Sequence, residues 1–382
     1  MAKISILSFP RYFNFGTFLQ LYAMQQTVSA LGHDAELIDY DPYNDSGKKG
    51  ASPLKTFLSR VKQRVLTAES DNFTVDKQSL KKRFQHFLHN ELNLGPTTYF
   101  SAQELCLSPP NADAVIVGSD QVWNPNGHFK DPAYFLTFVE PQKRIAYAPS
   151  FGVSDVPEET NNWLSEHLNG IPNLSVREHA GASIIHRLTG KRVPVVLDPA
   201  YLLRADTWRL FAGRKRPVKE KYLFCYFLES DPYMRDTALR IAKDRGLKTV
   251  MIPVHKADAK RNKGQFTLIK DAGPKEFVSL IEHADFVCTD SFHGTSFSLI
   301  LQRQFLTFKR YDNQQQAANH SRIASVLEAT GMQSRIADLS NCKSIGQSDI
   351  CFDKASIALD MMRQGSLEYL TTSIDNALNN NQ

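Results

Sequence analysis

The stretch TDSFHGTSFSLILQRQFLTFKR, residues 289–310, indicates what kind of fold to expect. An apolar run at 285–288 leads into it, and another apolar run begins at Phe305. A segment with helical spacing lies between the two runs, and the polar residues Asp290, Ser291 and His293 stand at its start. A strand, a polar turn, a helix and a further strand in this order are typical of a parallel α/β sheet.

The same alternation of strand and helix continues along most of the chain. Apolar runs occur at 3–9, 35–39, 112–117, 144–148, 173–176 and 193–197, and again at 222–228, 249–254, 285–289 and 304–309. These runs are continuously apolar, which indicates that helices cover both faces of each sheet. We therefore expect an α/β protein with two Rossmann-like domains, mostly parallel sheets and a cleft between them.

Breaks in the alternation predict the domain boundaries. The first domain is expected at 1–203, with a basic helical insertion at about 43–100. The charged stretch 204–221 opens the second domain, expected at 204–350. The remaining segment, 351–382, is predicted to be a helix that packs back on the first domain.

Composition narrows the class of protein. The 382 residues are 42% hydrophobic, and no apolar run approaches the roughly 20 residues of a membrane span. Five cysteines without a CxxC pair favour free thiols in a reducing cytoplasm. The sequence has no GxG fingerprint, no GxxxxGKS/T loop and no HExxH spacing, so we expect neither a cofactor nor a bound metal.

Polar residues follow five of the predicted strands, and ligands of doubly wound sheets bind beyond the carboxyl ends of strands. The candidate residues, in chain order, are Asn14, Gly16, Ser119, Asp120, Gln121, Trp123, Arg177, Ser291, His293, Gly294, Lys309, Arg310 and Arg322.

The turn at 289–294 is the strongest of these candidates. Unpaired N–H groups at a helix start attract anions, Gly294 lets the backbone approach a ligand, and His293 can donate a proton near neutral pH. The alternative is an ordinary helix cap made by Asp290 or Ser291, with His293 incidental.

The other candidates also have structural alternatives. Arg177 can hold a carboxylate or phosphate in a fork, or pair with Glu178 or Asp198. Trp123 can stack on a sugar ring beside polar neighbours, or simply pack in the core. Asn14 and Gly16 either approach a ligand or shape a turn, and the basic residues after the last strand can form a solvated face.

The order of several motifs resembles that of the polysaccharide pyruvyl transferase family. They are NFGTFLQLYAMQQTVSALGHDAELIDY, GSDQVWNP, SVREHAG, LDPAYLL, TDSFHGTSFSL and NHSRIASVLEATG, and together they span roughly residues 3–335. The resemblance implies two Rossmann-like domains arranged as in GT-B glycosyltransferases. It also implies transfer from phosphoenolpyruvate, a substrate, to two hydroxyls of a surface-polysaccharide sugar, which gives a pyruvate ketal.

The resemblance also implies roles for individual residues. Arg177 and His293 occupy donor-contacting positions. Ketal formation begins with delivery of a proton to the methylene carbon, and this chemistry makes His293 the candidate general acid and Asp120 a candidate for orienting or deprotonating the acceptor hydroxyl. Many members carry arginine where this chain has Ser291. Lys309, Arg310 and Arg322 are the candidates to replace that cation, with Ser291 and Gly294 beside the donor. Asn14, Gly16, Ser119, Gln121 and Trp123 are expected at the acceptor.

Two other functions remain open at this stage. One is a glycosyltransferase that uses a nucleotide sugar, although no Glu lies between Glu282 and Glu328, where such enzymes often carry a ribose-binding Glu. The other is a non-catalytic carbohydrate-binding protein, which is disfavoured because Arg177 and His293 are both present. No nucleic-acid partner is expected.

The basic segment 48–90 carries ten Lys and Arg against three Asp and Glu. Apolar residues recur at helical spacing in two stripes, one from Leu54 to Val65 and one formed by Leu80, Phe84, Phe87 and Leu88. The structural interpretation is a helical pair that covers the first domain. The alternative is peripheral contact with the anionic inner face of a membrane, or with a lipid-pyrophosphate-linked sugar acceptor.

Overall fold

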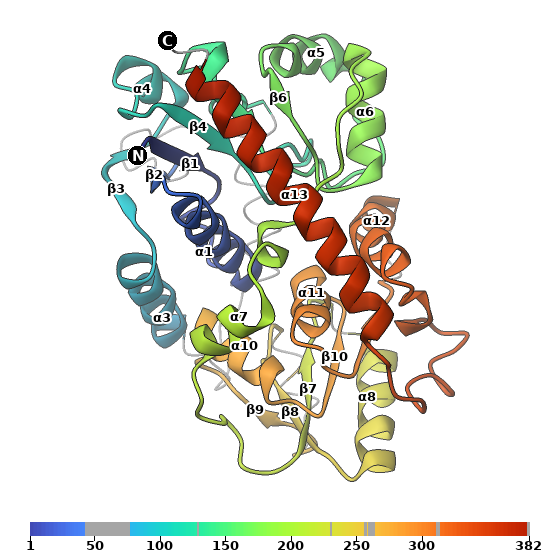
Figure 1. The fold of residues 1–382 in the computed structure, drawn as a ribbon. Helices are drawn as coiled ribbons and strands as arrows, with labels where there is room; N and C mark the ends of the chain where they lie inside the picture. Colours follow the sequence, from blue (N-terminus) through green and yellow to red (C-terminus); the bar gives the residue numbers. More distant parts are fainter. Residues whose placement is uncertain are drawn as a thin grey trace, which may run out of the picture.

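Two parallel β-sheets, each of six strands, form the framework of the described residues (Figure 1). The computed structural model describes residues 1–42, 77–127, 130–229, 231–255, 258, 264–310 and 314–379. The strand order is β3-β2-β1-β4-β5-β6 in the first sheet and β12-β11-β10-β7-β8-β9 in the second. The predicted α/β class with two Rossmann-like domains is therefore confirmed.

The strands of the first sheet are β1 (Lys3–Leu7), β2 (Asp34–Tyr40), β3 (Leu94–Tyr99), β4 (Ala114–Val117), β5 (Arg144–Ala146) and β6 (Asn173–Leu174). Those of the second are β7 (Tyr222–Tyr226), β8 (Lys248–Met251), β9 (Thr267–Leu268), β10 (Phe286–Thr289), β11 (Phe305–Phe308) and β12 (Ile336–Ala337). The α-helices are α1 (Phe15–Ala30), α3 (Lys77–Asn90), α4 (Ala102–Leu107), α5 (Asn161–Asn169), α6 (His179–Thr189), α7 (Ala205–Ala212), α8 (Pro232–Arg245), α10 (Pro274–Glu282), α11 (Phe292–Ile300), α12 (Gln314–Ala329) and α13 (Asp353–Asn379).

The central strands are buried along their whole length, as continuous apolar runs predict. Every residue of β4, β7, β10 and β11 is buried. The run predicted as a strand at 193–197 is an exception, because it makes only an isolated bridge between Val176 and Val195. Pro194 has no N–H to donate, which limits a longer ladder there.

The last helix crosses from the second sheet to the first. Figure 1 shows α13, in red, running along both halves of the molecule. It contacts β4 and β5 of the first sheet, and the Ser366 hydroxyl accepts a hydrogen bond from Leu197 N at 3.0 Å. No helix among the described residues is both long and apolar enough to cross a membrane.

Helix α3 packs against both domains. Phe84, Phe87 and Leu88 lie in the hydrophobic core, so this apolar stripe is not available to a membrane. Arg83 forms ion pairs with Asp271 at 2.9 Å and Glu276 at 2.7 Å in the second domain. The other stripe predicted for the insertion, at 54–65, lies outside the described residues.

Aromatic packing joins helices of the two domains. Phe15 of α1 stacks on Phe277 of α10, with ring centroids 4.7 Å apart and planes 8° apart. This contact lies in the one large core that both domains share. Helix α1 also contacts α11, so the start of α1 lies close to the start of α11, where the candidate site is found.

Candidate functional site

His293 projects from the second domain onto the first turn of α1. A side-chain carbon added to Gly16 would overlap the imidazole ring, so glycine is required for this close approach. The sequence offered two roles for Gly16, a close approach of the backbone to a ligand or the shaping of a turn. In this structure the space on its side-chain face is occupied by His293. The ring is buried, with 9% of the residue exposed.

The Asp198 carboxylate connects His293 to the first domain. Its Oδ2 accepts hydrogen bonds from Arg177 Nη1 at 2.5 Å and Ser119 Oγ at 3.2 Å. His293 Nε2 lies 3.6 Å from the same oxygen. The other oxygen, Oδ1, accepts from the backbone N–H of Ala200 at 3.0 Å and caps a short 3-10 helix, Pro199–Tyr201.

Charge and burial reinforce this arrangement. Burial raises the pKa of the Asp198 carboxyl, but the charges of His293 and Arg177 outweigh burial and hold that pKa well below its usual range. Burial lowers the pKa of Arg177, yet Asp198 and Asp120 more than compensate, so the net effect raises it. The carboxylate and the guanidinium are therefore both charged at neutral pH.

Arg177 retains hydrogen-bonding capacity inside the site. Its side chain is 2% exposed, and its Nε and Nη2 groups have no hydrogen-bond acceptor among the described residues. Nη2 lies 3.9 Å from Asp120 Oδ1, which is close enough for charge attraction but not for a hydrogen bond. Buried N–H donors of a cation in this state are suited to an anionic ligand.

A second buried arginine lies beside the first. The guanidinium carbons of Arg177 and Arg322 are 4.9 Å and 5.5 Å from the centre of the Phe292 ring, which stabilises both cations. Burial lowers the pKa of Arg322 to about 10, and repulsion by Arg177 adds to this effect. With its amide oxygen turned toward α12, Gln121 accepts from Arg322 Nη2 at 2.9 Å.

Asp120 is the more exposed of the two carboxylates beside Arg177. Its Oδ2 accepts a hydrogen bond from Thr17 Oγ1 at 2.5 Å, and its side chain is 15% exposed. Its backbone φ of 70° lies in the left-handed region, which aspartate tolerates better than most residues. The candidates thus brought together are Ser119, Asp120, Gln121, Arg177, His293 and Arg322.

Three candidates have capping or packing contacts in this structure. Ser291 is the N-cap of α11, with Oγ accepting from Gly294 N at 3.3 Å, and Asn14 is the N-cap of α1, with Oδ1 accepting from Gly16 N at 2.9 Å. A side chain on Gly294 would collide with Thr289, so glycine is needed here for packing against β10. The expected approach of its backbone to a ligand stays a prediction.

Two basic candidates are committed to other partners. Lys309 pairs with Asp338 at 3.3 Å, toward the edge strand β12. Arg310 Nε is 3.0 Å from Asp290 Oδ2, and Asp290 also accepts from Leu228 N at 2.6 Å. These contacts fix the ends of β7, β10 and β11, whereas Arg322 lies with Arg177 against the Phe292 ring.

The prediction that Trp123 forms a sugar platform is wrong. Trp123 is 0% exposed, stacks on Phe135 with centroids 5.3 Å apart and donates from Nε1 to Tyr134 O at 2.9 Å. Ser119 is also 0% exposed, and its hydroxyl is used by Asp198 and by Ala148 O at 2.9 Å. Both side chains are therefore closed off from a sugar substrate in this structure.

Sequence reasoning did not assign Asp198, Phe292 or Thr17 to the site. Asp198 lies in the LDPAYLL motif, and Phe292 stands beside His293. Their position in ordered motifs was the available signal, but their contacts depend on how the two domains meet. Among the described residues, no group of three or more His, Cys, Asp or Glu is arranged to hold a metal ion.

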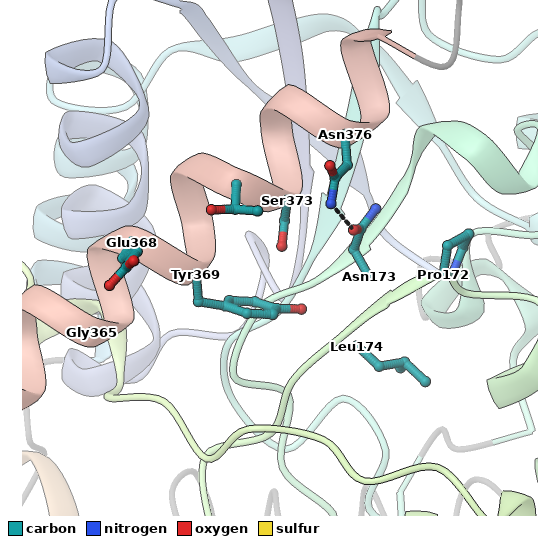
Figure 2. A pocket seen from close by; sticks show the side chains of 9 residues that line it. Pro172, Asn173, Leu174, Gly365, Glu368, Tyr369, Ser373 and Asn376 are labelled. Carbon is teal, nitrogen blue, oxygen red and sulfur yellow. Dashed lines mark hydrogen bonds between the residues drawn. The ribbon is translucent and has the colours of Figure 1, made fainter.

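A separate groove of about 380 Å³ lies between α13 and β6 (Figure 2). Tyr369, Glu368 and Asn376 of α13 line it, and Asn376 Nδ2 donates to Asn173 Oδ1 at 3.4 Å. None of the candidate site residues lines this groove, so it is distinct from the cluster around Asp198.

Comparison with solved structures shows the fold class of the chain. The UDP-N-acetylglucosamine 2-epimerase from Rickettsia bellii superposes with a TM-score of 0.51 at 11% identity, over 98% of this chain and 97% of that one. The UDP-GlcNAc 2-epimerase from Methanocaldococcus jannaschii, in complex with UDP-GlcNAc and UDP, gives 0.47 at 14% identity, over 95% and 100%. The first likeness, with the two parallel sheets, shows a GT-B arrangement of two Rossmann-like domains.

The family follows from the sequence. The profile of the family described as polysaccharide pyruvyl transferase matches residues 14–313, which is most of the chain. The chain therefore belongs to the polysaccharide pyruvyl transferase family, and the resemblance seen in the ordered motifs is confirmed. No curated protein matches the sequence.

Proposed function

We propose that this protein transfers the pyruvyl group of phosphoenolpyruvate to two hydroxyls of a polysaccharide sugar and forms a pyruvate ketal. The observation that carries the proposal is the pair of buried arginines, Arg177 and Arg322, beside His293 at the start of α11. Membership of the family supports transfer to a polysaccharide. The proposal adds phosphoenolpyruvate as the donor and a pyruvate ketal as the product.

The cluster is suited to a small donor with several negative charges. Phosphoenolpyruvate carries a phosphate and a carboxylate, each of which guanidinium groups bind in a fork. Arg177 offers two buried N–H groups that have no acceptor among the described residues. We assign one anionic group of the donor to Arg177 and the other to Arg322, which replaces the arginine often found where Ser291 stands.

The proposed reaction accounts for both hydroxyl protons and for the departing phosphate. A proton from His293 adds to the methylene carbon, which becomes the methyl group and leaves C2 electrophilic. One sugar hydroxyl attacks C2 and loses its proton, phosphate departs, and the second hydroxyl closes the ring. Of the two hydroxyl protons, one restores the acid and the other leaves with phosphate. We assign to Asp120, whose side chain is 15% exposed, the role of orienting or deprotonating the acceptor hydroxyl.

Phosphate release tests this proposal against its rival. With phosphoenolpyruvate and a polysaccharide acceptor, phosphate should appear, and His293→Ala should abolish its release while donor binding persists. Arg177→Ala should instead weaken donor binding, because the charged fork is lost. Turnover of a nucleotide sugar without any response to phosphoenolpyruvate would favour a glycosyltransferase.

Work on a lipid-linked acceptor would bring the protein to the cytoplasmic face of a membrane. Lys81 and Lys82 of α3 are exposed, whereas Arg83 holds the second domain through its ion pairs. Each basic residue near an anionic surface contributes roughly 1 kcal/mol, so such contact would be reversible and sensitive to salt. Co-sedimentation with anionic vesicles, but not neutral ones, would support it.

A further inference from the structure

One carboxylate oxygen of the site serves three side chains from separate segments. Asp198 Oδ2 lies 2.5 Å from Arg177 Nη1, 3.2 Å from Ser119 Oγ and 3.6 Å from His293 Nε2. Asp198 is 1% exposed, and its other oxygen is fixed by Ala200 N. The carboxylate therefore has little freedom to move, and the groups around it take their positions from it.

The contact with His293 distinguishes Asp198 from an ordinary buried ion pair. Arg177 and Ser119 belong to the same domain as Asp198, so their bonds alone would be structural. His293 comes from the other domain and is also confined by Gly16 of the first. His293 Nε2 is buried without a hydrogen-bond partner among the described residues at the present distance, so a shift of well under 1 Å would complete a bond to Asp198.

We propose that Asp198 is a positioning residue that assembles the site across the two domains, orienting the Arg177 fork for the donor and holding the protonated ring of His293 for proton transfer. This inference rests on the proposed function. It implies that the acid is correctly placed only when the second domain brings His293 against Asp198 and α1. The second domain alone would carry the histidine without its counter-charge.

The charges around His293 determine the expected pH dependence. Asp198 faces the ring from the first domain, and Arg177 and Arg322 lie against the neighbouring Phe292. Asp120 is attracted to Arg177 at 3.9 Å, and α1 presents Gly16, which has no charge. The negative charge nearest the ring is that of Asp198, so its removal should make the protonated ring less favourable.

The decisive variant is Asp198→Asn, which keeps the shape and the helix cap but removes the charge. We expect kcat to fall by about 10²-fold or more, as for the loss of a positioned general acid. The limb on which activity falls with rising pH should move to lower pH. Asp258→Asn is the matched control, because Asp258 is also buried and pairs with Arg235 at 3.1 Å but lies outside the site.

Two further measurements separate the possible failures. Histidine NMR signals of the whole protein, followed against pH, should show His293 losing its proton at lower pH in Asp198→Asn, whatever the substrate. Asp198→Glu keeps the counter-charge if the Asn variant does not fold, and its displaced oxygen should lower kcat. An unchanged kcat in Asp198→Glu, or unchanged pH behaviour in Asp198→Asn, would overturn the inference. A wild-type protein without pyruvyl transfer would instead overturn the proposed function.

Discussion

Gly16→Ala probes whether His293 acts from the position that the structure gives it. Gly16 is the second residue of α1, and its backbone is not in the left-handed region. Alanine is favoured over glycine within helices by about 1 kcal/mol, so α1 itself should tolerate the change. The new methyl group would instead overlap the His293 ring of the other domain.

The size of the effect follows from that overlap. An ordinary contact to a side-chain carbon is 3.4–4 Å, and the methyl carbon added at position 16 would lie far inside this limit against three atoms of the ring. The imidazole must withdraw by more than about 1 Å, and a misplacement of that size costs about 10²-fold in rate. Arg177 and Asp198 keep their own contacts, so donor binding should change much less than kcat.

Steady-state kinetics and thermal unfolding together provide the assay. Gly365→Ala is the matched control, because Gly365 also lies within a helix and nothing is found within 4 Å of its added carbon. Gly365→Ala should retain full activity and gain about 0.5–1 kcal/mol in the free energy of unfolding. If Gly16→Ala were as active as Gly365→Ala, His293 would not act from this position and the account of the site would be refuted.

Further predictions concern binding, stability and membrane contact. Arg322→Gln should raise the KM for phosphoenolpyruvate by about 10-fold or more, because one charge-assisted hydrogen-bonding group is lost; an unchanged KM would exclude the second cation. Trp123→Ala should lower the free energy of unfolding by about 3–5 kcal/mol in urea titrations yet leave the KM for the acceptor unchanged. The depressed pKa of Asp198 contributes stability that is fully present above about pH 4 and is lost as the pH falls toward the folded-state pKa. In Asp198→Asn, the free energy of unfolding should therefore decrease less steeply as the pH is lowered below about 4. Charge reversal at Lys81 and Lys82 should reduce recovery on anionic vesicles; equal recovery would leave α3 a purely structural role.

The sequence was most informative where burial alone decides the structure. The central strands were predicted closely because an unbroken apolar run has few alternatives to a strand covered on both faces. β3 was missed because Gly95 and Pro96 break its pattern, and β9 and β12 have only two residues each. Such short edge strands depend on their neighbours and not on their own residues.

Most of the residues in the site could be named from the sequence, but their contacts could not. Ser291 and Asn14 cap helices, and the residue types that cap a helix are also those that bind ligands, so local sequence could not separate the two roles. An aromatic residue after a strand, such as Trp123, can stack on a sugar or pack in the core, and the neighbouring sequence is compatible with both. Asp198 and Phe292 acquire their roles only when the domains meet.

Mass spectrometry of the acceptor glycan is the most direct test of the central claim. The whole protein is incubated with phosphoenolpyruvate and with surface-polysaccharide fragments from the cell in which the protein naturally occurs. The products are compared with those of His293→Ala. The account predicts that the wild type adds one pyruvyl group in ketal linkage to a sugar, with one phosphate released for each group added. Addition of a hexosyl residue from a nucleotide sugar, or no modification of any acceptor while phosphoenolpyruvate remains intact, would contradict it.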